Sequence, residues 1–395
     1  MIIKSFKDKK LSLLGFGTMR LPMNEDGSID EAQTREMIDY AIKHGVNYFD
    51  TAYPYHGGES EIVVGKILKD YPREKFYLAN KFPGHQIAES YDPKAIFEEQ
   101  LEKCGVEYFD FYLLHNVYEN SIETYMDPKW GILDYFKEQK RLGRIKHLGF
   151  STHGSLETIK KFLDYCGEDM EFCQIQLNYL DWTLQNAEEK YEFLRSKGIP
   201  VFVMEPLRGG KLASYPEEIE AQMKEKRDWE LISAWAFRFL QGLISVRMIL
   251  SGMSNLEQVK ENIKSFLYYK DLKEDEKEFL LNIAEDMKKS VPCTACKYCM
   301  DACPMGLNIP LFMEVYNELK FSPSVNASMR IECLPEDKKP SACIKCGNCT
   351  STCPQHIQIP EILEELSGML ETMPKWSDIS KEREEAAKRL QKKEK

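Results

Sequence analysis

The chain has 395 residues and a formal net charge of -11. This length exceeds what one hydrophobic core usually organises, so we expect one large domain and one smaller domain. A hydrophobic fraction of 43% together with 30% charged residues is typical of a folded protein. The acidic balance argues against binding to nucleic acid, because that affinity normally comes from a basic surface.

Neither a membrane segment nor a secretion signal is predicted. No apolar run approaches the roughly 18 residues that a transmembrane helix needs. Residues 1–10 are basic but are not followed by an apolar stretch with a cleavage site. We therefore expect a cytoplasmic protein without a membrane partner.

Short apolar segments alternate with longer amphipathic segments before the cysteine-rich part of the chain. The predicted strands are 13–19, 46–50, 76–82, 109–115, 145–150, 172–178, 200–204 and 246–251. The predicted helices are 31–44, 60–70, 93–104, 130–142, 155–165, 186–197, 229–241 and 255–266. Eight such units predict an α/β fold, a TIM (β/α)8 barrel. A doubly wound sheet is the alternative, but the early glycines lack the third glycine of a dinucleotide-binding fingerprint.

Four reactive side chains lie at the ends of successive predicted strands, where a TIM barrel places its chemistry. They are Asp50, Tyr55, Lys81 and His115. A lysine beside a tyrosine favours the phenolate, so the phenol can transfer a proton near neutral pH. Each residue alone has a structural explanation. Asp50 could cap a turn and Tyr55 could be a surface aromatic. Lys81 could be a solvated charge and His115 a core histidine. Their joint placement favours a catalytic site.

Three segments around these residues resemble the catalytic signature of the aldo-keto reductase family. They are residues 50–55 (DTAYPY), 80–82 (NKF) and 113–116 (LLHN). The resemblance covers about residues 1 to 270. It implies a barrel that transfers a hydride from NADP or NAD to an aldehyde or ketone. Tyr55 would be the general acid, Lys81 and Asp50 would assist it, and His115 would orient the carbonyl.

The same resemblance implies where the nucleotide binds. The candidates are Ser151, Thr152 and Gln174 for the carboxamide, Pro206, Leu207, Arg208, Gly209 and Lys211 for the pyrophosphate, and Gly252, Ser254, Gln258, Glu261 and Asn262 for the adenosine half. Two positions depart from the family pattern. Thr152 replaces the asparagine of many members, and Gln258 stands where some branches have an arginine for the 2′-phosphate. The choice between NAD and NADP is therefore open.

Eight of the 12 cysteines form two runs with the same spacing, each ending in Cys-Pro. This is the spacing of bacterial two-cluster ferredoxins, in which the fourth cysteine of each run binds the other 4Fe–4S cluster. One predicted ligand set is Cys293, Cys296, Cys299 and Cys353. The other is Cys343, Cys346, Cys349 and Cys303. Zinc is the alternative, but two three-cysteine ladders match its need for four ligands per ion poorly.

The predicted organisation has three parts. Residues 1–289 form the barrel, residues 290–375 form a mainly helical ferredoxin-like domain with two clusters, and residues 376–395 form a charged C-terminal tail. We expect an oxidoreductase for a small carbonyl substrate, with clusters that transfer electrons and a ferredoxin-like partner. The alternative is a redox-sensing or regulatory binding protein with structural clusters. A flavin would reconcile hydride and single-electron chemistry, but no flavin fingerprint is found.

Overall fold

The computed structural model describes most of the chain. The described residues are 1–86, 88, 90–288, 291, 293, 298–321, 323–353, 357–376, 378–379 and 381. They divide into two compact units. The first contains Met1–Trp182 and Asn186–Lys277, and the second contains Thr183–Gln185 and the described residues from Glu278 onward. Cys296 and most of the predicted tail lie outside the described residues.

The first unit is a closed barrel of parallel strands, so the predicted TIM barrel is confirmed. Around the barrel the strand order is β10-β3-β4-β5-β6-β7-β8-β9. The strands are β3 Leu14–Gly17, β4 Tyr48–Asp50, β5 Tyr77–Phe82, β6 Phe109–Leu114, β7 Ile145–Thr152, β8 Cys173–Gln176, β9 Val201–Met204 and β10 Val246–Gly252. Each overlaps one predicted strand, because short buried apolar runs between polar helices leave a clear signal.

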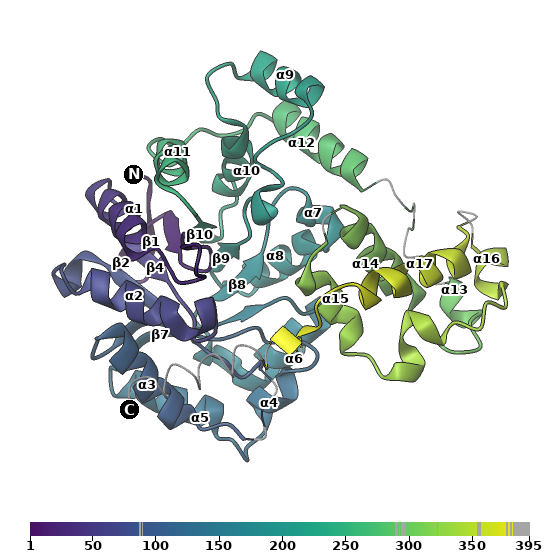
Figure 1. The fold of residues 1–395 in the computed structure, drawn as a ribbon, viewed down its shortest axis with the longest axis horizontal. Coiled ribbons are helices and arrows are strands. Elements are labelled where there is room, and N and C mark those ends of the chain that lie inside the picture. The colour runs from purple at the N-terminus through teal and green to yellow at the C-terminus, as the bar shows by residue number, and fades with distance from the viewer. Residues whose placement is uncertain are drawn as a thin grey trace. The chain divides into compact units, whose positions relative to one another are not determined.

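Helices surround the barrel (Figure 1). The predicted ones are observed as α1 Glu31–Lys43, α2 Glu59–Leu68, α3 Pro93–Cys104, α5 Ile132–Arg141, α6 Leu156–Cys166, α8 Ala187–Ser196, α10 Ile232–Gln241 and α11 Leu256–Ser265. Several begin at a capping side chain that accepts a hydrogen bond from a backbone N–H three residues later, as Asp30, Asp92, Ser155 and Asn255 do. Three further helices were not predicted, namely α4 Ile122–Met126, α7 Asp181–Leu184 and α9 Glu217–Lys226. In the described residues no helix is both long and apolar enough to cross a bilayer.

An N-terminal hairpin that was not predicted precedes the barrel. Its strands are β1 Ile3–Phe6 and β2 Lys9–Ser12, which pair antiparallel. Phe6 is buried in the aromatic core of the barrel, where its ring lies 5.4 Å from Phe111 and 5.6 Å from Phe202. The hairpin escapes prediction because each strand has only four residues and carries lysines among its apolar side chains.

A buried carboxylate joins this hairpin to the barrel. Glu171 pairs with His147 Nδ1 at 2.7 Å, with Lys7 Nζ at 2.7 Å and with Lys140. Burial alone would raise the pKa of Glu171, but hydrogen bonds from these three neighbours lower it to about 2. The ionised carboxylate therefore stabilises the fold.

We expect Glu171→Gln to lower the free energy of unfolding by about 2 kcal/mol at pH 7. The pKa is lower in the folded state than the ordinary value of 4.5, so this stabilisation is present above about pH 4.5 and is lost as the pH falls toward 2. Denaturant unfolding of both proteins between pH 7 and pH 3 should show the difference shrinking with acid. Glu138→Gln, at an exposed ion pair with Arg141, is the control and should change neither stability nor its pH dependence. A difference independent of pH would contradict the assignment.

The second unit is mainly helical in its described part, as predicted. Its helices are α12 Glu274–Met287, which begins in the first unit, α13 Tyr298–Asp301, α14 Ile309–Phe321, α15 Val325–Glu332, α16 Asn348–Ser351 and α17 Ile359–Glu371. A short helix followed by a long one occurs in both halves, since α13 precedes α14 and α16 precedes α17. The short pair pack together and so do the long pair. Their shared core includes Phe312, Leu319 and Leu363, all fully buried.

Candidate active site

A buried lysine lies at the centre of the predicted catalytic group. Lys81, near the end of β5, is fully buried. Its Nζ donates to Asp50 Oδ1 at 2.5 Å, to the Thr51 carbonyl oxygen at 2.7 Å and to Tyr55 Oη at 3.4 Å. Burial alone would lower the pKa of Lys81, but the charge of Asp50 and the hydrogen bonds to Asp50 and Tyr55 outweigh burial and raise it. The lysine is therefore a cation within reach of the phenol.

The structure brings all four predicted catalytic residues together. Asp50 ends β4, and Tyr55 begins the 3-10 turn Tyr55–Gly58 that follows. His115 comes directly after β6, and its N–H donates to the Phe82 carbonyl oxygen at 3.0 Å. The rings of Tyr55 and His115 lie 6.0 Å apart, nearly perpendicular. A phenol and an imidazole thus flank the same place at the C-terminal ends of β4 and β6, the two strands on either side of β5.

A buried polar network that sequence reasoning missed fixes the backbone of Lys81. Asn80 Oδ1 accepts from the Lys81 N–H at 2.8 Å, and Gln100 Nε2 donates to the Lys81 carbonyl oxygen at 3.0 Å. Both amides also donate to the fully buried carboxylate of Glu61, at 2.7 and 2.9 Å. No sequence signal distinguishes Glu61 or Gln100 from other polar residues on amphipathic helices. They become recognisable only when α2 and α3 pack on β5.

A second imidazole, also missed from the sequence, lies beside His115. His85 is only 3% exposed, and its ring centroid is 4.3 Å from that of His115. It belongs to the loop after β5, three residues beyond the strand. Gly84 allows this loop to approach closely, because a Cβ there would lie 2.6 Å from the Tyr125 ring. Inspection of strand-end residues alone does not reach this position.

Two predicted carboxamide contacts lie side by side, and their polar atoms suit that role. Ser151 on β7 pairs in register with Gln174 on β8. Gln174 is 2% exposed, and its buried Oε1 has no hydrogen-bond partner among the described residues. A buried amide oxygen of this kind needs a donor, which the carboxamide of a nicotinamide would supply. Thr152 differs, because its hydroxyl donates to the Val117 carbonyl oxygen at 2.6 Å and is already used within the protein.

The loop after β9 holds the predicted pyrophosphate residues Pro206, Leu207, Arg208, Gly209 and Lys211. Arg208 is buried at 6% exposure, and its Nε donates to the fully buried Asp181 at 3.0 Å. The guanidinium is therefore engaged with a carboxylate inside the protein. Burial, followed by the charge of Arg208, lowers the pKa of Lys211. The sequence did not reveal Asp181 as the partner of Arg208.

The predicted adenosine contacts lie at the end of β10 and on α11. Gly252 ends the strand, and the Ser254 N–H donates to Gln258 Oε1 at 2.7 Å. Glu261 is half-buried, whereas Asn262 is buried and donates to Ser251 Oγ at 2.9 Å. Of these side chains, Ser254 and Gln258 lie at the start of α11, where a helix favours an anion.

The second unit gathers the cysteines of one predicted ligand set. Cys303, Cys343, Cys346 and Cys349 line a single small cavity. Burial raises the pKa of Cys349, and the charges of Cys343 and Cys303 raise it further. No three His, Cys, Asp or Glu side chains in the described part could hold a metal ion directly. A four-iron cube spaces its thiolates more widely than one ion does, so this donor set fits a 4Fe–4S cluster.

The other ligand set is described only in part. Cys299 is buried on α13, and Cys293 and Cys353 are half-buried. These three cysteines pack against or within the core of the second unit. The fourth predicted member, Cys296, lies outside the described residues.

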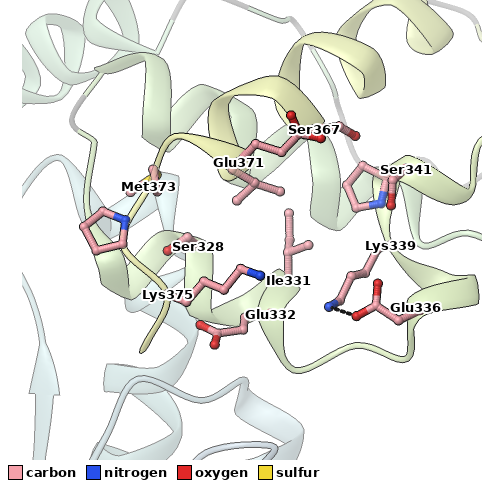
Figure 2. A pocket seen from close by; sticks show the side chains of 13 residues that line it. Ser328, Ile331, Glu332, Glu336, Lys339, Ser341, Ser367, Glu371, Met373 and Lys375 are labelled. Atoms are coloured by element: carbon pink, nitrogen blue, oxygen red, sulfur yellow. Dashed lines mark hydrogen bonds and ion pairs between the residues drawn. The ribbon is translucent and has the colours of Figure 1, made fainter. Parts of the chain in front are cut away.

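A larger cavity in the second unit carries different chemistry (Figure 2). Its volume is about 250 Å³, and α15, α17 and the loop between Glu336 and Ser341 line it. Glu332, Glu371 and Lys375 contribute charges. It contains neither cysteine nor histidine and shares no lining residue with the cysteine cavity. It is therefore not a cluster site.

The barrel resembles solved aldo-keto reductases. The holo form of aldo-keto reductase AKR11C1 from Bacillus halodurans superposes with a TM-score of 0.59 at 25% identity, covering 72% of this chain and 96% of that chain. An aldo-keto reductase from Klebsiella pneumoniae in complex with NADPH superposes with a TM-score of 0.58 at 19% identity, covering 72% of this chain and 96% of that chain. This similarity shows a shared fold.

Sequence relatives point the same way. The NADH-specific methylglyoxal reductase of Escherichia coli K12 is 26% identical over 301 residues, or 65% of this chain and 90% of that protein. A probable aldo-keto reductase 1 of Glycine max is 31% identical over 212 residues, covering 51% of this chain and 57% of its own length. Residues 292–358 match the model of a 4Fe-4S dicluster domain. Residues 13–278 match the model of the aldo/keto reductase family, and the chain is a member of that family of oxidoreductases, with an iron–sulfur domain after its barrel.

Proposed function

We propose that the barrel reduces an aldehyde or ketone to an alcohol with NADH or NADPH. The contact of Lys81 with both Asp50 and Tyr55 carries this proposal. A bound nicotinamide cofactor supplies the hydride that is added to the carbonyl carbon. Tyr55 donates the proton to the carbonyl oxygen, Lys81 stabilises the phenolate that remains, and His115 orients the carbonyl. Solvent then returns a proton to Tyr55.

Several residues support nucleotide binding at this site. Ser151 and Gln174 offer polar atoms for a carboxamide, and the buried Gln174 Oε1 lacks a partner within the described structure. The start of α11, with Ser254 and Gln258, suits an anionic group. Gln258 adds no positive charge for a 2′-phosphate, so titrations with NADH and NADPH in parallel are needed to choose between the two nucleotides.

We propose that the second domain holds two 4Fe–4S clusters with crossed ligands and passes single electrons to a ferredoxin-like partner. Cys303 lies with Cys343, Cys346 and Cys349 around one cavity, although it belongs to the other run in sequence. We assign Cys293, Cys296, Cys299 and Cys353 to the other cluster. Eight cysteines used for clusters favour a reducing compartment, so we propose a cytoplasmic location.

The deciding experiment is an anaerobic assay of the cluster-loaded protein. NADH or NADPH oxidation would be followed with a panel of small aldehydes and ketones, and nucleotide binding would be measured by fluorescence. Saturable turnover of a carbonyl compound is expected. Binding of a nucleotide without turnover of any compound would favour a redox-sensing or regulatory protein. Binding of neither nucleotide would end the reductase proposal.

The electron-transfer proposal has its own test. Reduction with dithionite, monitored by absorbance and electron paramagnetic resonance, should yield the signals of reduced 4Fe–4S clusters. Addition of an oxidised ferredoxin should then restore the absorbance within the time of mixing. Clusters that cannot be reduced, or that keep their electrons in the presence of ferredoxin, would mark a structural role.

A further inference from the structure

Two histidines from different strand loops are held together beside the predicted phenol. His85 follows β5 and His115 follows β6, and their ring centroids are 4.3 Å apart with an interplanar angle of 63°. His85 is buried at 3% exposure. An imidazole in this position shields one side of the His115 ring and restricts its rotation.

The hydroxyl of Tyr125, on α4, fixes the two loops relative to each other. It donates to the His115 carbonyl oxygen at 2.6 Å, and the Tyr125 hydroxyl oxygen accepts from the backbone N–H groups of Gly84 and His85. The hydroxyl also lies 3.2 Å from the Phe82 carbonyl oxygen. The contact between the imidazoles is therefore supported by the backbone and does not depend on side-chain packing alone.

The charges around this pair limit how many protons it can hold. Lys81 from β5 is a buried cation that contacts Tyr55, and Asp50 from β4 pairs with that lysine. Tyr55 faces His115 at 6.0 Å, and Tyr125 contributes a neutral hydroxyl from α4. Two imidazolium ions at this separation would repel each other, so the second proton binds with a clearly lower pKa than the first.

We propose that His85 is a positioning residue that holds the His115 ring and is coupled to it, so that the pair accepts only one proton at neutral and weakly acidic pH. The inference rests on the proposed reductase function, in which His115 meets the carbonyl. A neutral imidazole donates one hydrogen bond without adding a cation beside Lys81. The pair then behaves as one unit that titrates in two steps.

The test uses His85→Phe, which keeps an aromatic ring against His115 but removes the second titrating group. In the cluster-loaded wild type, the imidazole NMR signal of His115 should shift in two steps with pH, and in the variant in one. The acid limb of kcat should change from the two-step profile of the coupled pair in the wild type to a single protonation in the variant. On the neutral plateau kcat should change by less than about threefold.

His44→Phe is the matched control, because His44 stacks on Tyr40 at 3.9 Å in α1 and lies outside the site. It should leave the acid limb and the His115 signal unchanged. A single-step titration of His115 in the wild type would overturn the proposal without any variant having to fold. An equal loss of kcat at every pH in His85→Phe would also overturn it, because packing alone would then explain the effect. The NMR titration needs no turnover, so its result is independent of whether the reductase proposal holds.

Discussion

Tyr55→Phe is expected to lower kcat for carbonyl reduction by about 10²- to 10⁴-fold, while leaving nucleotide affinity within about threefold of the wild type. The substitution removes the Tyr55 hydroxyl, whose oxygen lies 3.4 Å from Lys81 Nζ, and with it the proton that the carbonyl oxygen must receive. The ring itself remains, so its contact with His115 is kept. The loss should therefore appear in the chemical step.

The measurement compares steady-state kinetics with fluorescence titration of the nucleotide, both under anaerobic conditions. Tyr53→Phe is the matched control two residues earlier in the same loop, because its hydroxyl donates to Glu99 at 3.2 Å rather than approaching the lysine. It should retain kcat within about twofold. If Tyr55→Phe kept a tenth or more of the wild-type kcat, another group would have to be the acid. The reductase reading could survive that result, but the role of Tyr55 could not.

The fold was predictable because its signals are local. Each barrel strand is a short buried run, and helices such as α3 start at a capping aspartate and end at Gly105 with a positive φ of 62°. The β1–β2 hairpin lacks such a signal, since Lys4 and Lys10 interrupt its apolar pattern. It is defined by Phe6, which finds its aromatic partners more than a hundred residues away.

The residues of the candidate site also divide into those with a local sequence signal and those without one. Asp50, Lys81 and His115 stand at strand ends, a position that sequence order reveals. His85 lies three residues beyond the end of β5. Its contact with His115 becomes visible only when the loops after β5 and β6 are seen together in the structure.

Arg208 shows most clearly that the partner of a charged residue could not be predicted from the sequence. Its loop suggests a phosphate ligand, yet the guanidinium pairs with Asp181, 27 residues earlier in the chain. The spacing of charged residues along a chain does not specify which of them will be buried together, because burial of an ion pair depends on how neighbouring loops pack.

Removing cluster ligands in pairs is expected to show whether the two sets cross. With crossed sets, the double variant Cys303→Ser/Cys349→Ser damages one cluster and should retain about four of the eight iron atoms of a two-cluster domain. Cys299→Ser/Cys303→Ser damages both clusters and should retain almost none. Sets formed within each run would give the reverse result, because Cys299 and Cys303 would then share a cluster. Iron and sulfide analysis of anaerobically purified protein, with the absorbance near 400 nm, measures the difference.

The cavity geometry favours the first outcome. Cys303 lines the same space as Cys343, Cys346 and Cys349, and its charge is among the causes that raise the pKa of the Cys349 thiol. Cys333→Ser is the control, because this lone cysteine donates to the Arg330 carbonyl oxygen at 3.2 Å and belongs to neither run. It should keep the full iron content. Cluster loss should also destabilise the second unit, since Cys349 lies in one core with Leu363 and a cluster held by these cysteines would cross-link that core. A Cys303→Ser/Cys349→Ser protein without iron would show that the runs bind their clusters separately.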